Sequence, residues 1–358
     1  MPADPQTGSG TALHTHVRPG TRAWRGRVGA MFGALLMANA AAWLWAWDAF
    51  GDRPALLGTA LLAWVFGLRH AVDADHIAAI DNVVRKLMQD GQRPIGVGLF
   101  FSLGHASVVF LACAVIAATA ATIPLEAVRE VTGTIGTAVS ASFLMLIGLG
   151  NLLILRQVWG QLRHVRRDGR LPAQPFDAAG PQGLLTRLLR PALRAIRRSW
   201  QMYPLGFLFG LGFDTATEIG LMAIAATQAA GGLHPWEVLV FPALFTAGMT
   251  LVDSADSILM VGAYEWAFVD PLRKLWYNLT ITAASVAVAL LIGGVEAAGM
   301  LADRLSLDGP AWRFVATLNE DVTLLGCLVI GIFVLAWIVS AGLYRWAAWN
   351  VRPATAQD

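Results

Sequence analysis

Eight stretches of the chain are apolar enough and long enough to cross a lipid bilayer, whose hydrocarbon core of roughly 30 Å needs about 20 helical residues. Hydrophobic residues make up 56% of the chain and charged residues 14%, which excludes a soluble domain with a polar surface. The sequence therefore predicts an all-α, polytopic membrane protein with eight transmembrane helices. The expected spans are 28–47, 55–80, 95–121, 135–157, 202–229, 238–266, 279–302 and 321–344.

The distribution of Lys and Arg predicts the orientation of these spans. With the N-terminus placed inside, 21 of the 26 basic residues fall in inside segments, and 10 of those lie between residues 156 and 201. Four fall in outside loops, and Arg69 lies within a span. Basic residues accumulate on the cytoplasmic side of membrane proteins, so we expect the N-terminus and the C-terminus to be cytoplasmic and the chain to lie in the cell (inner) membrane. The net charge of +2 gives no reason to expect a nucleic-acid partner.

The segments between and beyond the spans complete the predicted organisation. Neither a disulfide framework nor a redox pair is expected from Cys113 and Cys327, because both fall in predicted spans. No Walker A pattern occurs, so the chain cannot hydrolyse ATP by itself. The predicted regions are a disordered cytoplasmic tail at 1–27, a first four-helix group at 28–157, a basic cytoplasmic loop at 158–201, a second four-helix group at 202–345 and a cytoplasmic tail at 346–358.

The second span contains an unusual number of ionisable groups. Residues 66–81 read FGLRHAVDADHIAAID, with two histidines and three aspartates inside or beside an apolar stretch. Ionisable side chains at bilayer depth are costly and mark functional sites. Imidazoles beside carboxylates, without cysteine, suit a divalent first-row metal such as nickel, cobalt or zinc. We therefore predict a metal site with these candidates: His70, Asp73, Asp75 and His76.

Three further spans carry polar groups that are expected to face a shared cavity. His105 lies in the third span, and on its own it could instead be a hydrogen-bonded contact between helices. The fifth span carries Asp214 and Glu218, and the sixth carries Asp253 and Asp256. Each acidic pair is spaced to share one helix face. Two close carboxylates in a dry site should bind a metal or hold a proton.

The spacing within the second span leaves two interpretations open. On an ideal helix His70, Asp73 and His76 follow one another at steps of about 60°, whereas Asp75 points the other way. Either the helix is locally broken, or Asp75 accepts a hydrogen bond or carries a proton without binding the metal. We favour a local break. Asp81, next to the inner end of the span, needs no role beyond solvation.

A short repeat precedes both motif-bearing spans, since Phe66–Leu68 and Phe209–Leu211 both read FGL. The second and third spans are predicted to join inside, and the fifth and sixth to join outside. The two hairpins therefore run in opposite senses across the bilayer. We interpret them as an inverted repeat of the kind found in alternating-access transporters.

With these motifs in hand, the chain resembles the nickel/cobalt transporter family, often written NiCoT. The family's second-helix signature, R-H-A-x-D-A-D-H-I, is matched by Arg69–Ile77. Its other motifs are matched at Leu103–Val109, Leu211–Glu218 and Gly248–Asp256. The resemblance covers nearly the whole hydrophobic chain. It implies a high-affinity permease for Ni²⁺ and Co²⁺ with the second-helix motif central to recognition.

The predicted function is a secondary transporter for high-affinity uptake of Ni²⁺ and/or Co²⁺ across the cytoplasmic membrane. We expect His70, His76 and His105 to bind the ion, and Asp73 and Asp75 to complete or tune its shell. The acidic residues of the fifth and sixth spans would compensate the charge of the ion or line its exit. The divalent transition-metal ion is the substrate, the lipid bilayer is the surrounding partner, and neither a resident cofactor nor an ATPase partner is required.

Two alternatives remain from the residues. The first is nickel or cobalt efflux by proton exchange, although the central loop offers only His164 where exporters usually carry a His-rich loop. The second is an intramembrane metal-dependent hydrolase, although the H-E-x-x-H pattern is absent. We expect a carrier and not an enzyme, because carboxylates on several spans suit a permeation path better than a single general base.

Overall fold

The structure is a computed structural model that describes residues 21–119, 125–168, 196–212, 215–267, 271–320, 326–336, 338–339 and 342. Within these residues every regular element is a helix and there is no strand. The prediction of an all-α fold is therefore confirmed.

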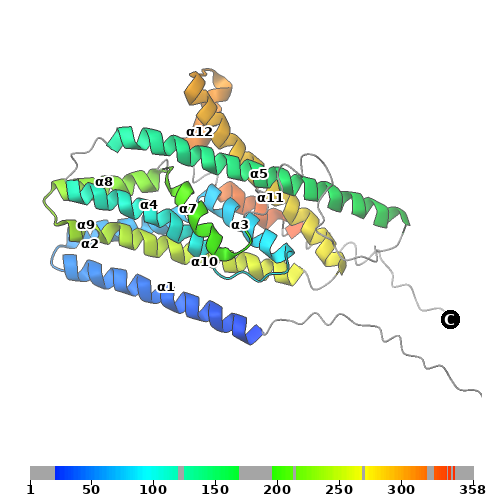
Figure 1. Ribbon diagram of the computed structural model, residues 1–358, viewed down its shortest axis with the longest axis horizontal. Coiled ribbons are helices and arrows are strands. Elements are labelled where there is room, and N and C mark those ends of the chain that lie inside the picture. Colours follow the sequence, from blue (N-terminus) through cyan, green and yellow to red (C-terminus); the bar gives the residue numbers. More distant parts are fainter. Residues whose placement is uncertain are drawn as a thin grey trace, which may run out of the picture.

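The helices run mostly along one long axis (Figure 1). Their bounds are α1 Thr21–Phe50, α2 Pro54–His70, α3 Ala74–Gln89, α4 Val97–Thr119, α5 Leu125–Asp168, the short 3-10 helix η1 Ser199–Gln201, α7 Met202–Gly210, α8 Ala216–Ala230, α9 Pro235–Val238, α10 Val240–Ala267, α11 Pro271–Leu305 and α12 Pro310–Glu320. Helices α4 and α10 lie in the middle and pack against each other, α7 against α4, and α2 against α10. Helix α5 packs along α11, and α12 projects from the bundle (Figure 1).

Among the described residues, five helices are long and apolar enough to span a membrane, and the count rises to six if one bent pair forms a single span. That pair is α2 and α3, with a bend of 49° at the break. The predicted fifth span, 202–229, is divided into α7 and α8. Of the predicted eighth span, the structure describes a helix at Gly326–Ala336. The predicted number of eight spans is therefore not confirmed, whereas several apolar, membrane-capable helices are present.

Two boundaries differ from the predicted ones. Helix α1 begins at Thr21, so residues 21–27 are helical and do not belong to a disordered tail. Their Arg, Ala, Trp and Gly residues extend the first apolar helix by about two turns instead of interrupting it. Helix α5 continues to Asp168, so the first part of the predicted basic loop 158–201 is helical as well. Residues 1–20, 169–195 and 343–358, which include the rest of the predicted tails and most of the loop, lie outside the described residues.

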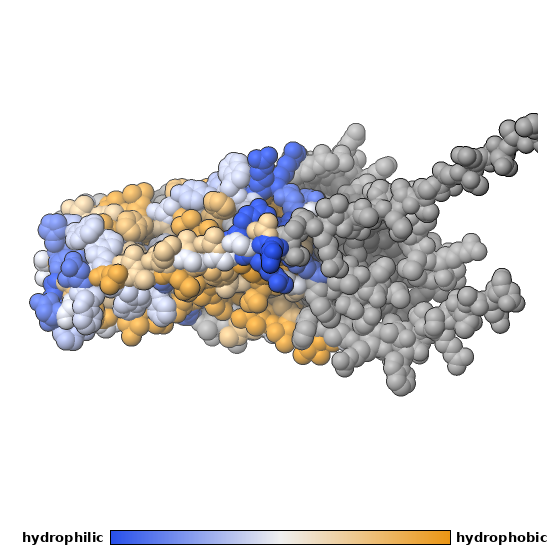
Figure 2. Space-filling model, turned by 90° about the horizontal axis from the view of Figure 1, so that it is seen from below, coloured by the Kyte–Doolittle hydropathy of each residue, from blue (hydrophilic) through white to orange (hydrophobic). Residues whose placement is uncertain are grey.

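The outer surface fits a lipid environment. Met37, Leu44 and Trp47 of α1 are 69%, 70% and 66% exposed, respectively, although they are large and hydrophobic. Figure 2 shows the side of the molecule on which α1 lies, with hydrophobic residues covering a broad band between hydrophilic regions. An apolar surface this large on a soluble monomer would promote association. Lipid tails cover such a band in a membrane protein.

Helices α2 and α7 approach their neighbours through glycines in the same way. A Cβ atom at Gly67 of α2 would overlap the backbone carbonyl of Phe245 in α10. A Cβ atom at Gly206 of α7 would overlap the backbone carbonyl of Phe101 in α4. Small residues allow backbones to come this close inside membranes. The contact between α2 and α10 therefore recurs between α7 and α4.

Glycines on the partner helices α10 and α4 also make matching contacts with α2 and α7. A Cβ atom at Gly248 of α10 would meet the backbone of Trp64 in α2, and a Cβ atom at Gly104 of α4 would meet the backbone of Tyr203 in α7. In both pairs the glycine belongs to the unbroken helix and its neighbour belongs to the first half of the broken one. This pattern is expected when α2 and α10 are related to α7 and α4 by a two-fold rotation, as in inverted repeats.

The same contacts correct the register of the repeat. Gly67 corresponds to Gly206 and not to Gly210, because Gly67 and Gly206 make the equivalent contacts. The segment equivalent to Phe66–Leu68 is therefore 205–207, about one helical turn before the second FGL at Phe209–Leu211. The two FGL segments match by chance. The close backbone approach, and not the shared letters, is therefore the observation that supports an inverted repeat.

Candidate metal centre

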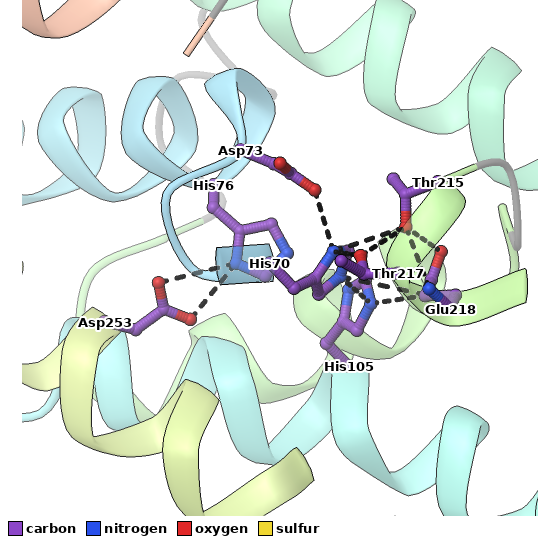
Figure 3. A network of polar contacts seen from close by, with 8 residues as sticks. All are labelled: His70, Asp73, His76, His105, Thr215, Thr217, Glu218 and Asp253. Carbon is purple, nitrogen blue, oxygen red and sulfur yellow. Dashed lines mark hydrogen bonds and ion pairs between the residues drawn. The ribbon is translucent and has the colours of Figure 1, made fainter. Parts of the chain in front are cut away.

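Three histidines from three helices meet in the interior of the bundle (Figure 3). The ring centroids of His70 and His76 lie 4.7 Å apart, and each lies 4.8 Å from that of His105. One potential ligand atom from each ring lies within 4.8 Å of the others, and the three side chains are almost completely buried. The rings thus form a nearly equilateral triangle around one point.

The break between α2 and α3 brings two of these rings together. His70 is the last residue of α2, Asp73 precedes α3 with an extended backbone, and His76 lies in the first turn of α3. In a continuous helix, two residues six positions apart are separated by about 9 Å along the axis. Residues 71–73 interrupt the helix and α2 and α3 meet at a bend of 49°, so the local break that we favoured from the spacing is confirmed.

Each histidine contacts a carboxylate. Asp73 Oδ2 lies 2.8 Å from Nδ1 of His70, and Asp253 Oδ2 of α10 lies 3.1 Å from Nδ1 of His76. Glu218 Oε1 of α8 lies 2.8 Å from Nε2 of His105. A carboxylate bonded to one ring nitrogen fixes the orientation of the ring and makes the other nitrogen a better ligand. His70 and His76 have this arrangement, because a carboxylate lies at Nδ1 and Nε2 is left for an ion. His105 differs, because Glu218 and His70 both lie at its Nε2.

The centre of the triangle is rich in lone pairs. Nε2 of His105 lies 2.8 Å from Glu218 Oε1 and 2.9 Å from Nε2 of His70, which in turn is 3.9 Å from the same Glu218 oxygen. A single N–H can point at one of these acceptors and not at the other. Nε2 of His76 is buried without a partner among the described residues. A cation at this point would be attracted by all of these atoms.

Hydroxyl groups that the sequence reasoning missed hold the carboxylates in place. Ser102 of α4 donates to Asp253 Oδ2 at 2.6 Å, and Thr215 donates to Glu218 Oε2 at 3.0 Å. Thr217 lies 3.1 Å from Nδ1 of His70. The pattern Thr215-x-x-Glu218 is a helix-start signature, and it could have indicated both the break before α8 and the position of Glu218.

The remaining candidates lie elsewhere. Asp75 is half-buried, and among the described residues its side chain forms no hydrogen bond. Asp214 lies outside the described residues. Asp256 does not join Asp253 at the histidines, and its Oδ2 is buried without a partner in the described part. Asp81 is fully buried, so the expectation that it is solvated is wrong; the helix continues three turns past His76 inside the bundle.

Comparison with known proteins settles the family. The NicO family model, described as a high-affinity nickel-transport protein, matches residues 56–343. The chain belongs to this family. The resemblance to nickel/cobalt transporters that the motifs indicated is therefore confirmed.

Relatives of the nickel-transport family match along most of their length. The hydrogenase nickel incorporation protein HupN of Bradyrhizobium diazoefficiens is 56% identical over 88% of this chain and 83% of its own length. The high-affinity nickel transport protein of Cupriavidus necator is 53% identical over 94% of this chain and 95% of its own length. The cobalt transport protein NhlF of Rhodococcus rhodochrous is 37% identical over 88% of this chain and 92% of its own length. No solved structure matches this chain significantly.

Proposed function

We propose that this member of the nickel-transport family is a permease for high-affinity uptake of Ni²⁺ and/or Co²⁺ across the cytoplasmic membrane. His70, His76 and His105 bind the ion, with Asp73 and Asp75 completing or tuning its shell. The buried triangle of imidazoles is the observation that carries this proposal. Asp214, Glu218, Asp253 and Asp256 compensate the charge of the ion or line its path.

The ligand chemistry supports transition metals over magnesium. Imidazole nitrogen suits nickel and cobalt, whereas Mg²⁺ prefers oxygen ligands and keeps several waters. The three histidines are buried, so an ion that binds them must lose most of its water. Losing water is easier to offset with three nitrogen ligands when the ion is Ni²⁺ or Co²⁺.

Uptake needs no ATPase partner. A divalent cation that moves down the membrane potential releases roughly 4.6 kcal/mol per 100 mV, which supports an accumulation ratio on the order of two thousand. Efflux would need a second energy source such as proton exchange. The uptake experiment described below must therefore distinguish uptake from efflux.

The proposed topology has eight spans with both termini in the cytoplasm. In this arrangement α2 and α3 form one broken span, α7 and α8 form another, and 321–344 is the eighth. The two broken spans each interrupt a helix at the histidine triangle, as the discontinuous helices of transporters do at their binding sites. A C-terminal alkaline phosphatase fusion should be inactive and a C-terminal green fluorescent protein fusion should fluoresce; the reverse would remove the proposed sidedness.

The test is uptake of ⁶³Ni²⁺ and ⁵⁷Co²⁺ by cells that produce the wild type, His76→Ala or His234→Ala, at nanomolar metal with millimolar Mg²⁺. His76 is buried in the triangle, and His234 is an exposed residue before α9, so His234→Ala is a matched control. We expect accumulation in cells with the wild type and the control, and its loss with His76→Ala.

Other results would overturn the proposal. Less metal than in cells without the protein would indicate efflux. No difference between these cells, for a chain shown to be in the membrane, would remove the transport function and favour a metal-dependent enzyme. Equal losses in His76→Ala and His234→Ala would mean that the triangle has no special role.

A further inference from the structure

A second buried polar cluster lies beyond the histidine triangle. Asp81 of α3 is fully buried, and each of its carboxylate oxygens accepts a hydrogen bond. Oδ1 accepts from Tyr264 of α10 at 2.8 Å, and Oδ2 accepts from Ser285 of α11 at 2.7 Å. An ionisable group inside a membrane bundle requires a functional explanation, and the histidine site does not supply one.

Two further hydroxyls lie on the helices that hold this carboxylate. Ser257 and Thr282 are fully buried, and their hydroxyls have no partner among the described residues. Ser257 lies seven residues before Tyr264 on α10, and Thr282 lies three residues before Ser285 on α11. Helical periodicity therefore places them on the same faces as the two donors to Asp81. Buried hydroxyls without partners are unfavourable, and together they indicate room for a ligand.

The cluster contains a second carboxylate. Asp256 interacts electrostatically with both Asp253 and Asp81. Its Oδ2 is buried without a partner in the described part of the chain. Asp256 follows Asp253 by one turn on α10, a rise of about 4.5 Å. It therefore lies within electrostatic reach both of Asp253 at the histidine triangle and of Asp81.

Within the described part of the chain, no ion pair neutralises these two carboxylates. Arg85 of α3 is buried and within electrostatic reach of Asp81. Among the described residues, however, it bonds through Nη2 to Asn82 Oδ1 at 2.9 Å, and its Nε and Nη1 have no partner. The buried carboxylate of Asp81 and the partly buried carboxylate of Asp256 outnumber the single guanidinium near them, and this excess of negative charge favours binding of a cation.

We propose that this cluster is a second cation station that takes a divalent ion through oxygen ligands alone, after the ion leaves the histidines. Its ligands are Asp81, Asp256, Ser257, Tyr264, Thr282 and Ser285. The direction of passage rests on the proposed uptake function, whereas the station itself does not. Oxygen ligands suit Mg²⁺ and Mn²⁺ better than Ni²⁺, so the station holds nickel more weakly than the triangle and favours its release.

Mn²⁺ alone is the probe that separates the two sites, because it prefers oxygen ligands and its free form is measured by electron paramagnetic resonance. The protein is the purified full chain in lipid nanodiscs. The wild type and His76→Ala should bind Mn²⁺ with equal affinity. Asp81→Asn should bind it at least tenfold more weakly. Asp52→Asn, which alters a side chain that is 90% exposed, is the matched control and should bind Mn²⁺ as the wild type does.

A second variant tests the proposal independently in case Asp81→Asn does not fold. Asp256→Asn removes a charge from a carboxylate whose Oδ2 has no partner among the described residues. It should also weaken Mn²⁺ binding at least tenfold. In cells it should lower the maximal rate of ⁶³Ni²⁺ uptake at least fivefold, with less than a twofold change in the concentration that gives half the maximal rate.

Two results would overturn the station. One is a wild type that binds no Mn²⁺, and the other is an Asp256→Asn variant that binds it unchanged. Failure of the uptake function gives a different result: Mn²⁺ binding would remain and depend on Asp81, while the wild type would accumulate no nickel. The two proposals can therefore fail separately.

Discussion

Nε2 of His70 lies 2.9 Å from Nε2 of His105, although these residues belong to different helices and stand 35 positions apart in the chain. Two imidazole nitrogens this close share at most one proton between them unless a ring is charged. Glu218 adds a carboxylate oxygen to the same point. The three atoms leave more lone pairs than one shared proton can satisfy, which favours binding of a divalent cation at this point.

Replacement of Glu218 by Gln should lower the affinity for nickel. The amide keeps the size of the side chain but removes a buried negative charge beside two histidines, and a dehydrated divalent ion in a low-dielectric site needs that charge. We expect the half-saturating concentration for ⁶³Ni²⁺ uptake to rise at least tenfold.

Glu237→Gln is the control for Glu218→Gln. Glu237 pairs with Arg53 near the start of α9, where the side chains are 22% and 41% exposed. Partly exposed ion pairs contribute little to stability, so uptake should stay within twofold of the wild type. Equal effects of the two substitutions would mean that the charge at Glu218 does not act on the ion.

Replacement of Ser102 by Ala should act through His76. Ser102 holds Asp253, which holds Nδ1 of His76, so the substitution loosens the orientation of the ring without touching it. Loss of such an outer partner typically costs 10–100-fold in metal affinity. We expect weaker Ni²⁺ binding to the purified chain with little change in the maximal uptake rate. Ser107→Ala on the same helix should bind Ni²⁺ normally; a Ser102→Ala variant with unchanged affinity would contradict this role.

Gly67→Ala should destabilise the bundle. The added methyl group would overlap the backbone of Phe245, and overpacking of this kind costs about 1–3 kcal/mol. Gly58→Ala on the same helix is the control, because nothing lies within 4 Å of the methyl group there. Alanine favours helix over glycine by about 1 kcal/mol, so Gly58→Ala should unfold at an equal or higher temperature in detergent.

The proposed inverted repeat leads to a further prediction about the unfolding temperature in detergent. Gly206→Ala should lower the unfolding temperature about as much as Gly67→Ala, because the two glycines make equivalent contacts. A much smaller effect of Gly206→Ala would mean that the two crossings are not equivalent in energy.

The sequence predicted the membrane helices and the histidines because both leave strong local signals. Hydropathy marks spans, and a run such as Arg69–Ile77 is conspicuous in apolar surroundings. Which carboxylate meets which ring could not be predicted, because those pairs join residues up to 177 positions apart, as in His76 and Asp253. Helical spacing grouped Asp253 with Asp256, whereas of the two only Asp253 contacts a histidine among the described residues.

The burial of polar side chains was the second property that could not be predicted from the sequence. Asp81 comes just after an apolar segment, and sequence position alone suggested contact with water. The structure buries it because α10 and α11 cover that end of α3 with Tyr264 and Ser285. Ser102 was overlooked for a similar reason: a single hydroxyl in a span usually bonds to its own helix, and its partner Asp253 is 151 residues away.

The most direct test of the central claim is X-ray absorption at the nickel edge on the purified full chain loaded with one equivalent of Ni²⁺. We predict a first shell with scattering from the three imidazole rings, and the loss of one ring in each of His70→Ala, His76→Ala and His105→Ala. A shell of oxygen ligands alone, or a spectrum that His76→Ala leaves unchanged, would contradict the assignment of the triangle as the metal site.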